Sequence, residues 1–284
     1  MPTFSNPSGK TMTLSNRQAL VRIARKYDAL IITDDVYDAL QFPTSLKTAT
    51  SSLTLALLPR LVDIDMTMEP IPGPYDFGNA VSNGSFSKIA GPGVRTGWAE
   101  ASLKFTYGLS QCGSSRSGGA PSQLTATIMS EQLRSGDLES HIEHVLKPAY
   151  KKRYEVMMDA IQTALVPLGV KVGEASYGTE QVFGGYFIWL ELPPGANADE
   201  IAARAKQQEN LIVAPGRLFE VSTDSSVKFE NSIRLCFAWE AEEDMKEGIV
   251  RLGRVVKATL DGVPWKQKAN YKDEMIKKDL GEFK

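Results

Sequence analysis

SNRQALVRIARKYDALIITDD, residues 15–35, joins two patterns of apolar residues that predict different secondary structures. In its first half, apolar side chains recur at Leu20, Ile23, Ala24 and Tyr27, the i, i+3, i+4, i+7 spacing of an amphipathic helix. The second half, LIITDD, is a short β-rich apolar run that ends in two carboxylates. A helix followed directly by a buried strand is typical of α/β architecture with a parallel sheet, and we expect that fold class.

Composition and charge narrow the kinds of protein that this chain can be. The 284 residues are 42% hydrophobic and 23% charged, which is ordinary for a globular protein of one large domain or two smaller ones. A net charge of -2 gives no reason to expect nucleic acid or a membrane as a partner. The N-terminus carries no signal-peptide pattern and no apolar run is long enough to span a bilayer, so we expect a cytoplasmic protein. With two histidines, two cysteines and no CxxC, we expect no metal site, serine-histidine triad or disulfide framework.

After residue 35 the sequence continues with further helix and strand patterns. Two helices are predicted over residues 120–136 and 138–166, and Pro148 should bend or divide the second. Residues 39–80 form a long connection with several prolines, and the tail from residue 265 is charged and peripheral. The remaining predicted strands are 96–102, 181–193, 211–216 and 231–239, and the remaining predicted helices are 198–210 and 242–260.

The pattern changes within the second of these helices, where strands and helices begin to alternate in a different order. We therefore expect a larger domain with a mainly parallel sheet over residues 1–140. A smaller α+β domain should follow over residues 141–284 and carry the charged tail.

SNGSFSKIAGPGVRTGW, residues 82–98, places Lys88 between serines and a glycine-rich turn. A lysine that is desolvated among small residues can act as a nucleophile toward an aldehyde and form a Schiff base. Ser85 and Ser87 offer hydroxyls, and Arg95 supplies a planar donor fork suited to a phosphate. A Schiff-base lysine and a phosphate anchor are what pyridoxal phosphate requires. From this stretch alone, a flexible Ser/Gly loop with two unrelated cations is about as well supported.

Three further residues fit the same chemistry, each with an alternative. Asp34, at the carboxyl end of the apolar strand, could keep a pyridine nitrogen protonated, or it could be an ordinary turn carboxylate. Tyr37 could hydrogen-bond a ring hydroxyl or be a partly buried structural tyrosine. Arg234 interrupts the apolar run SIRLCFAW, where its guanidinium needs a partner. A substrate α-carboxylate and a structural ion pair are equally open as that partner.

Four stretches, in this order, resemble the signature motifs of the fold-type I, class I/II pyridoxal-phosphate aminotransferases. They are NPSGKTMTLSNRQALVRIARKYDALIITDDVY, SNGSFSKIAGPGVRTGW, APGRLF and NSIRLCFAW. The resemblance runs from residue 1 to about residue 260 and is nearest to the aminoadipate and aromatic aminotransferase branch. It implies the fold-type I architecture, with a large cofactor-binding domain and a smaller C-terminal domain.

The resemblance assigns ring contacts of pyridoxal 5'-phosphate to three residues. Asn6 matches the asparagine that hydrogen-bonds the ring oxygen of the cofactor. Asp34 matches the aspartate paired with the pyridinium nitrogen. Tyr37 matches the tyrosine beside the ring hydroxyl.

The resemblance also assigns the remaining site residues. Lys88 matches the Schiff-base lysine, which, once an amino acid displaces it, is the general base that moves a proton from the substrate Cα. Ser85, Ser87 and Arg95 match groups around the phosphate, and Arg234 matches the arginine that holds the substrate α-carboxylate. The implied reaction transfers the amino group of an amino acid to a 2-oxo acid in a homodimer. A lyase on the same scaffold remains an alternative, whereas a DNA-binding regulator is disfavoured because no basic N-terminal module is seen.

In this family a long region normally precedes the N-P-x-G motif, at which this sequence starts. That region usually supplies the first strands of the large domain, a glycine-rich loop for the phosphate and an aromatic that stacks on the ring. The resemblance therefore implies an incomplete large domain. A truncated, noncatalytic relative is a further alternative to an active enzyme.

Overall fold

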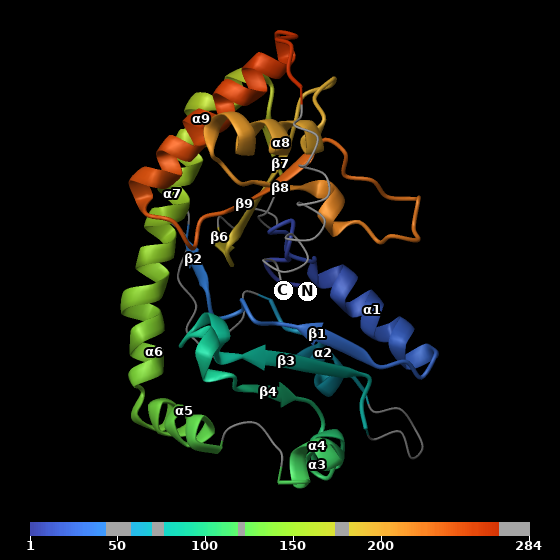
Figure 1. Cartoon of the computed structure of the whole chain (residues 1–284). Helices are drawn as coiled ribbons and strands as arrows, with labels where there is room; N and C mark the ends of the chain where they lie inside the picture. The colour runs from blue at the N-terminus through green and yellow to red at the C-terminus, as the bar shows by residue number, and fades with distance from the viewer. Residues whose placement is uncertain (44–57, 70–76, 119–122, 174–181, 267–284) are drawn as a thin grey trace. The chain divides into compact units, whose positions relative to one another are not determined.

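The computed structural model describes residues 1–43, 58–69, 77–118, 123–173 and 182–266. The chain forms two compact units, and Figure 1 labels their helices and strands. The first unit is Met1–Tyr154 with Gly173–Phe187, and the second is Glu155–Val172 with Ile188–Lys284.

The sheet of the first unit has three strands in the order β1-β3-β4. β1 runs parallel to β3, with Ile31 opposite Ala80 and Asp34 opposite Asn83. β4 is antiparallel to β3, because the turn that contains Gly91 reverses the chain between them. In the described part of the chain this sheet is therefore mixed rather than mainly parallel. The strands are β1 (Ile31–Asp34), β3 (Ala80–Ser85) and β4 (Gly97–Glu100).

The predicted helix before the first strand is confirmed. α1 spans Leu14–Lys26, and the Thr13 side chain accepts a hydrogen bond from the Asn16 amide, as an N-cap does. The helix buries Val21. This side chain packs in one apolar cluster with residues of the following helix and of β3. The cluster consists of Val21, Leu61, Val62, Ile64 and Ala80.

The long connection over residues 39–80 contains two elements that the sequence pattern did not predict. β2 (Gln41–Pro43) and α2 (Leu61–Thr67) lie within it, while residues 44–57 and 70–76 lie outside the described residues. α2 forms because its apolar side chains complete the cluster around Val21, and because Asp63 accepts a hydrogen bond of 2.8 Å from the Arg60 amide at its start.

Two helical segments follow β4 before the predicted helix pair, which is confirmed. Within the second predicted helix, a short π-helical stretch at residues 142–146 comes immediately before Pro148 enters the next α-helix. Pro148 lacks an amide hydrogen, so the regular i to i-4 ladder cannot continue through it. The helices are α3 (Leu103–Ser110), α4 (Gly113–Arg116), α5 (Gln123–Ser135), α6 (Asp137–His141) and α7 (Lys147–Ala164).

The division between the two units differs from the predicted boundary between residues 140 and 141. Ile142 is fully buried in the core of the first unit, and Leu146 and Tyr150 pack against that core. Residues 182–184 also return to the first unit, because β6 (Val182–Gly184) pairs antiparallel with β2. The sequence pattern did not reveal this long-range pairing.

The single strand predicted over residues 181–193 is two strands. β6 ends at Gly184 and β7 (Phe187–Glu191) begins after Tyr186. Gly185, between them, has a φ of +68°, a left-handed conformation that interrupts a strand.

The second unit combines a four-stranded sheet with two long helices, and in that sheet β5 pairs antiparallel with β7 and β8 pairs antiparallel with β9. The sheet order is β5-β7-β9-β8, and α8 packs against α9. In the predicted strand over 211–216 only Ala214 and Pro215 pair with β9, and residues 267–284 of the tail lie outside the described residues. The elements are β5 (Lys171–Val172), α8 (Ala198–Glu209), β8 (Ala214–Pro215), β9 (Ser232–Cys236) and α9 (Glu242–Leu260). Among the helices that the structure describes, none combines the length and apolarity needed to cross a bilayer.

Candidate functional site

Two neighbouring strands of the first unit end at the same edge of the sheet. Asp34 is the last residue of β1, and its parallel partner Asn83 lies five residues before Lys88 on the chain. The carboxyl ends of adjacent parallel strands are where ligands gather in α/β sheets. Asp34 and Asn83 are both exposed, and Ile32, on the same face of β1 as Asp34, is 70% exposed. The sheet topology therefore brings the predicted aspartate and the segment that carries the predicted lysine to one edge.

Lys88 is the last residue of a single 3-10 turn, η1 (Phe86–Lys88), that follows β3. The Ser85 hydroxyl accepts a hydrogen bond of 3.1 Å from the Ser87 amide and so caps the turn. Phe86 is buried against the Trp98 ring, at 4.8 Å between ring centroids, which fixes the turn to β4. Lys88 itself is half-buried, and the two predicted serines lie beside it on the same turn.

The Lys88 amine lies beside a pair of packed tyrosine rings. Its Nζ is 5.9 Å from the ring centroid of Tyr37 and 5.3 Å from that of Tyr186. Tyr37 is only 3% exposed and packs against Tyr186 at 5.1 Å and Phe187 at 6.2 Å between centroids. The predicted Tyr37 and Lys88 are therefore neighbours in the first unit. Tyr186 was missed by the sequence analysis, although the two glycines before it in FGGYF were an available signal.

The two adjacent aspartates of the TDD stretch have different environments. Asp34 is exposed, whereas Asp35 is buried on the opposite face of the strand. The Asp35 carboxylate accepts hydrogen bonds from the Thr33 hydroxyl at 2.5 Å and the Ser82 hydroxyl at 2.6 Å. Asp35 thus connects β1 to β3 on the buried face, while the Asp34 carboxylate is exposed on the other face.

A second buried carboxyl group follows the tyrosine. Burial raises the pKa of Asp38 to about 8, and the neighbouring Asp35 charge adds to the effect. Arg17 and Arg60 oppose this increase through their positive charge. The Arg17 guanidinium is fully buried and donates to the Pro2 carbonyl at 3.1 Å, so it holds the N-terminal segment against α1.

Asn6 and Arg95 are exposed residues of the first unit. Asn6 sits in a turn closed by a hydrogen bond of 2.9 Å from the Ser5 amide to the Lys10 carbonyl. Arg95 ends the short helical turn Pro92–Val94 and donates to the Pro92 carbonyl at 3.1 Å. Neither geometry by itself identifies a ligand.

Arg234 belongs to the second unit, unlike the seven other predicted site residues. It lies on β9 opposite Ala214 of β8. Its guanidinium carbon is 4.7 Å from the centroid of the Phe219 ring, a stacking arrangement that suits a planar guanidinium.

Comparison with known proteins identifies the family. The family model described as "Aminotransferase class I and II" matches residues 2–252, so the chain belongs to that family. It is 40% identical over 259 residues to the Saccharomyces cerevisiae protein "Uncharacterized protein YER152C", covering 91% of this chain and 55% of that protein. It is 28% identical over 257 residues to aromatic-amino-acid aminotransferase 1 of Thermococcus litoralis, covering 90% of this chain and 53% of the relative.

A solved structure gives the same result for the fold. The α-aminoadipate aminotransferase of Thermus thermophilus, complexed with N-(5'-phosphopyridoxyl)-L-leucine, matches with a TM-score of 0.69 at 26% identity. The match covers 93% of this chain and 59% of that chain. The fold is thus that of the fold-type I aminotransferases, as predicted, and the chain spans about half the length of the curated relatives it matches.

The cofactor of this family is pyridoxal 5'-phosphate, and the residues at the sheet edge fit it through the chemistry that they offer. Lys88 offers an amine, Asp34 a carboxylate on an exposed face, and Tyr37 a phenol whose ring lies near that amine. Ser85 and Ser87 place hydroxyls on the turn that carries the amine. These are the types of group that an aldehyde, a pyridine nitrogen, a ring oxygen and a phosphate each require.

Proposed function

We propose that this chain carries the cofactor-binding core of an amino acid aminotransferase, which transfers the amino group of an amino acid to a 2-oxo acid. The main support is the pairing of β1 with β3, because it brings Asp34 and the turn of Lys88 to one edge of one sheet. Family membership agrees with this assignment.

Lys88 would hold the cofactor covalently through its Nζ. When pyridoxal phosphate is bound, it supplies an electron sink for the bonds at the substrate Cα. The Lys88 amine, once released, would act as the general base that removes the proton from the substrate Cα. The rings of Tyr37 and Tyr186 lie on one side of that amine and limit where it can reach.

The ring contacts would be divided among three residues of the first unit. Asp34 would keep a proton on the pyridine nitrogen, since a carboxylate stabilises the positive charge there. Tyr37 and Asn6 would donate hydrogen bonds to the ring oxygen, which fixes the orientation of the ring.

The phosphate and the substrate would be bound by other groups. Ser85, Ser87 and Arg95 would donate to phosphate oxygens. Arg234 would bind the substrate α-carboxylate in a bidentate manner, and the Phe219 ring against it would hold the guanidinium plane in one orientation. The assembly that we propose is a homodimer, as is usual in the family.

The test is a complete transfer reaction. The purified protein with pyridoxal phosphate is incubated with 2-oxoglutarate and, one at a time, 2-aminoadipate, phenylalanine, alanine or glutamate, the last with pyruvate as acceptor. The proposal predicts a new 2-oxo acid and the matching new amino acid in equal amounts. It also predicts that neither forms with the Lys88→Ala variant.

Other products would contradict the proposal. Release of ammonia together with an oxo acid, without a new amino acid, would indicate a lyase on the same scaffold. Cofactor binding without any turnover of these substrates would indicate a noncatalytic relative.

A further inference from the structure

Tyr186 contacts both ends of Lys88. Its hydroxyl donates a hydrogen bond of 3.1 Å to the Lys88 backbone carbonyl, and the centroid of its ring is 5.3 Å from the Lys88 Nζ. The Tyr186 side chain therefore contacts both the backbone carbonyl and the side-chain amine of Lys88.

The Tyr186 hydroxyl is itself held by a second tyrosine. The hydroxyl oxygens of Tyr150 and Tyr186 are 3.1 Å apart, and their ring centroids are 5.2 Å apart. A phenol has one proton, and that of Tyr186 is directed to a carbonyl that can only accept. Tyr150 must therefore be the donor in the second hydrogen bond, which sets a single direction for the chain Tyr150 to Tyr186 to Lys88.

The two glycines before Tyr186 make this placement possible. A Cβ on Gly184 would lie 2.4 Å from the Leu40 carbonyl oxygen, so the close pairing of β6 with β2 requires a residue without a side chain. Gly185 has a φ of +68°, and a Cβ there would lie 3.0 Å from the Phe4 Cβ. Gly185 therefore ends β6 and turns the backbone, and the next residue, Tyr186, contacts Lys88.

The Lys88 carbonyl needs a hydrogen-bond donor from outside its own turn, and the Tyr186 hydroxyl supplies one. Lys88 is the last residue of a one-turn helix, and the last carbonyls of a helix lack partners within it. A lysine side chain also has four rotatable bonds, so its amine samples many positions unless neighbouring groups confine it. The Tyr186 hydroxyl stabilises the turn, and the rings of Tyr186 and Tyr37 bound the space of the amine.

We propose that Tyr186 is a positioning residue for Lys88, that its hydroxyl and its ring each contribute, and that Tyr150 orients the hydroxyl. This inference rests on the proposed role of Lys88 as the amine that joins the cofactor. Tyr186 acts through Lys88, and it needs no contact of its own with a substrate.

The test measures how fast Lys88 joins pyridoxal phosphate. The protein is mixed with pyridoxal phosphate, borohydride is added at increasing times, and mass spectrometry quantifies the phosphopyridoxyl group on the peptide that contains Lys88. Noncovalent affinity for the cofactor is measured in parallel, as quenching of intrinsic fluorescence in the Lys88→Ala background. Thermal unfolding checks that each variant is folded.

Four substitutions separate the contributions. Tyr186→Phe, which keeps the ring, should slow attachment by about two- to tenfold, the effect expected for one neutral hydrogen bond. Tyr186→Leu should slow it further, and Tyr150→Phe should slow it by about twofold. Tyr154→Phe is the matched control, because it removes a phenol hydroxyl from a partly buried tyrosine of the same unit, whose ring stacks on Phe183 at 4.2 Å between centroids. It should attach the cofactor at the wild-type rate.

The outcomes distinguish this inference from the function on which it rests. A graded loss of rate from wild type to Tyr186→Phe to Tyr186→Leu, with unchanged noncovalent affinity, supports positioning. Attachment at the wild-type rate in Tyr186→Phe and Tyr150→Phe overturns it, even where Tyr186→Leu fails to fold. Attachment that persists in Lys88→Ala would instead overturn the role of Lys88 itself.

Discussion

Ser82 on β3 donates a hydrogen bond of 2.6 Å to the buried carboxylate of Asp35, which follows β1. Asp35 is the residue next to Asp34, and Ser82 lies six residues before Lys88. This bond therefore ties together the two strands that position the candidate cofactor residues.

Removal of this hydroxyl should weaken the sheet. Ser82→Ala leaves the Asp35 carboxylate with one donor fewer in a buried place, and we expect a loss of about 1.5 to 3 kcal/mol in the free energy of unfolding. Urea unfolding measures the change. Ser110→Ala, which alters an exposed serine at the end of α3, should change the same free energy by less than about 0.5 kcal/mol. If both substitutions lowered the free energy of unfolding equally, the hydrogen bond from Ser82 to Asp35 would not contribute to stability as we expect.

Asp38 should make the stability of the protein depend on pH. Its pKa in the folded chain is raised to about 8, while an unfolded aspartate titrates near about 4. The folded state therefore binds the proton more tightly, and the stabilisation is fully present below about pH 4 and is lost as the pH rises toward about 8. The slope attributable to this group is at most about 1.4 kcal/mol per pH unit.

Substitution of Asp38 tests this dependence. Asp38→Asn should flatten the decline in the free energy of unfolding between pH 5 and pH 8, measured by denaturant titration at each pH. Asp261→Asn, at an exposed carboxylate just after α9, should leave the decline in place. An unchanged slope in Asp38→Asn would contradict a raised pKa for this carboxyl group.

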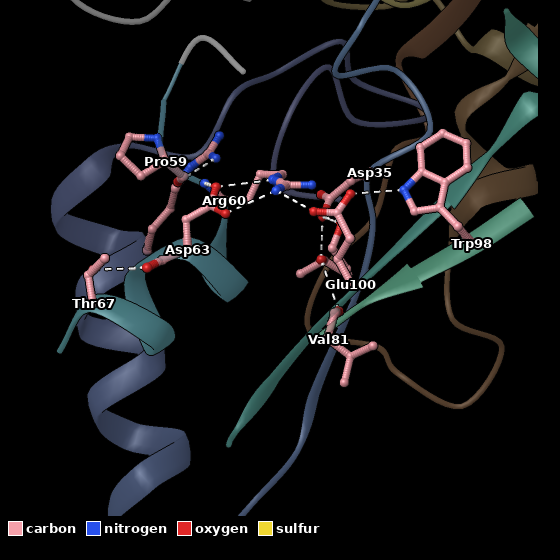
Figure 2. Close-up of polar contacts among 11 residues, drawn as sticks. Asp35, Pro59, Arg60, Asp63, Thr67, Val81, Trp98 and Glu100 are labelled. Atoms are coloured by element: carbon pink, nitrogen blue, oxygen red, sulfur yellow. Dashed lines mark hydrogen bonds and ion pairs between the residues drawn. The ribbon is translucent and has the colours of Figure 1, made fainter. Parts of the chain in front are cut away.

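Arg60 links the start of α2 to β4. Figure 2 shows its guanidinium between Asp63 and Glu100. The guanidinium donates to Asp63 at 3.0 Å and to Glu100 at 2.6 Å, and the Trp98 indole donates to Glu100 at 2.9 Å. The Arg60 hydrogen bond lowers the pKa of Glu100, so its stabilising effect should be present at neutral pH and be lost as the pH falls into the acidic range.

The size of this effect should be modest because Glu100 is partly exposed to solvent. A double-mutant cycle of Arg60→Met and Glu100→Gln should give a coupling of about 0.5 to 1 kcal/mol at pH 7, which decreases in high salt. A coupling that does not change with salt would argue that the contact is not mainly electrostatic.

Gly185 should tolerate alanine less well than other glycines of the same conformation. Gly185→Ala places a Cβ at a φ of +68° and 3.0 Å from the Phe4 Cβ, and we expect a cost of about 2 to 3 kcal/mol in the free energy of unfolding. Gly136→Ala is the matched control, since Gly136 has a φ of +80° but open space around its Cβ position. It should cost only about 1 kcal/mol. A similar cost for both would mean that the packing against Phe4 does not matter.

Local patterns were sufficient to predict much of this fold. α1 and β1 follow from apolar spacing within one short stretch, and the turn after Lys88 follows from its glycines and Pro92. These features depend on neighbours in sequence, so they are visible without a structure. The irregular helix before Pro148 is predictable for the same reason.

The features that were not predicted depend on distant contacts. α2 is only seven residues long, and it forms against Val21 and β3. The pairing of β2 with β6 joins residues far apart in the chain, and it carries Tyr186 to Lys88. The sequence analysis singled out Asp34, but it gave no role to Asp35, and only the packing against Ser82 shows that Asp35 is buried and joins the two strands.

The most direct test of the account is to locate the covalent bond to the cofactor. Protein reduced with borohydride in the presence of pyridoxal phosphate is digested, and the modified peptide is sequenced by mass spectrometry. We predict one phosphopyridoxyl group per chain, on Lys88, with greatly reduced labelling in Asp34→Ala and none at position 88 in Lys88→Ala. Labelling spread over several surface lysines, and unaffected by either substitution, would contradict the assignment of this sheet edge as the cofactor site.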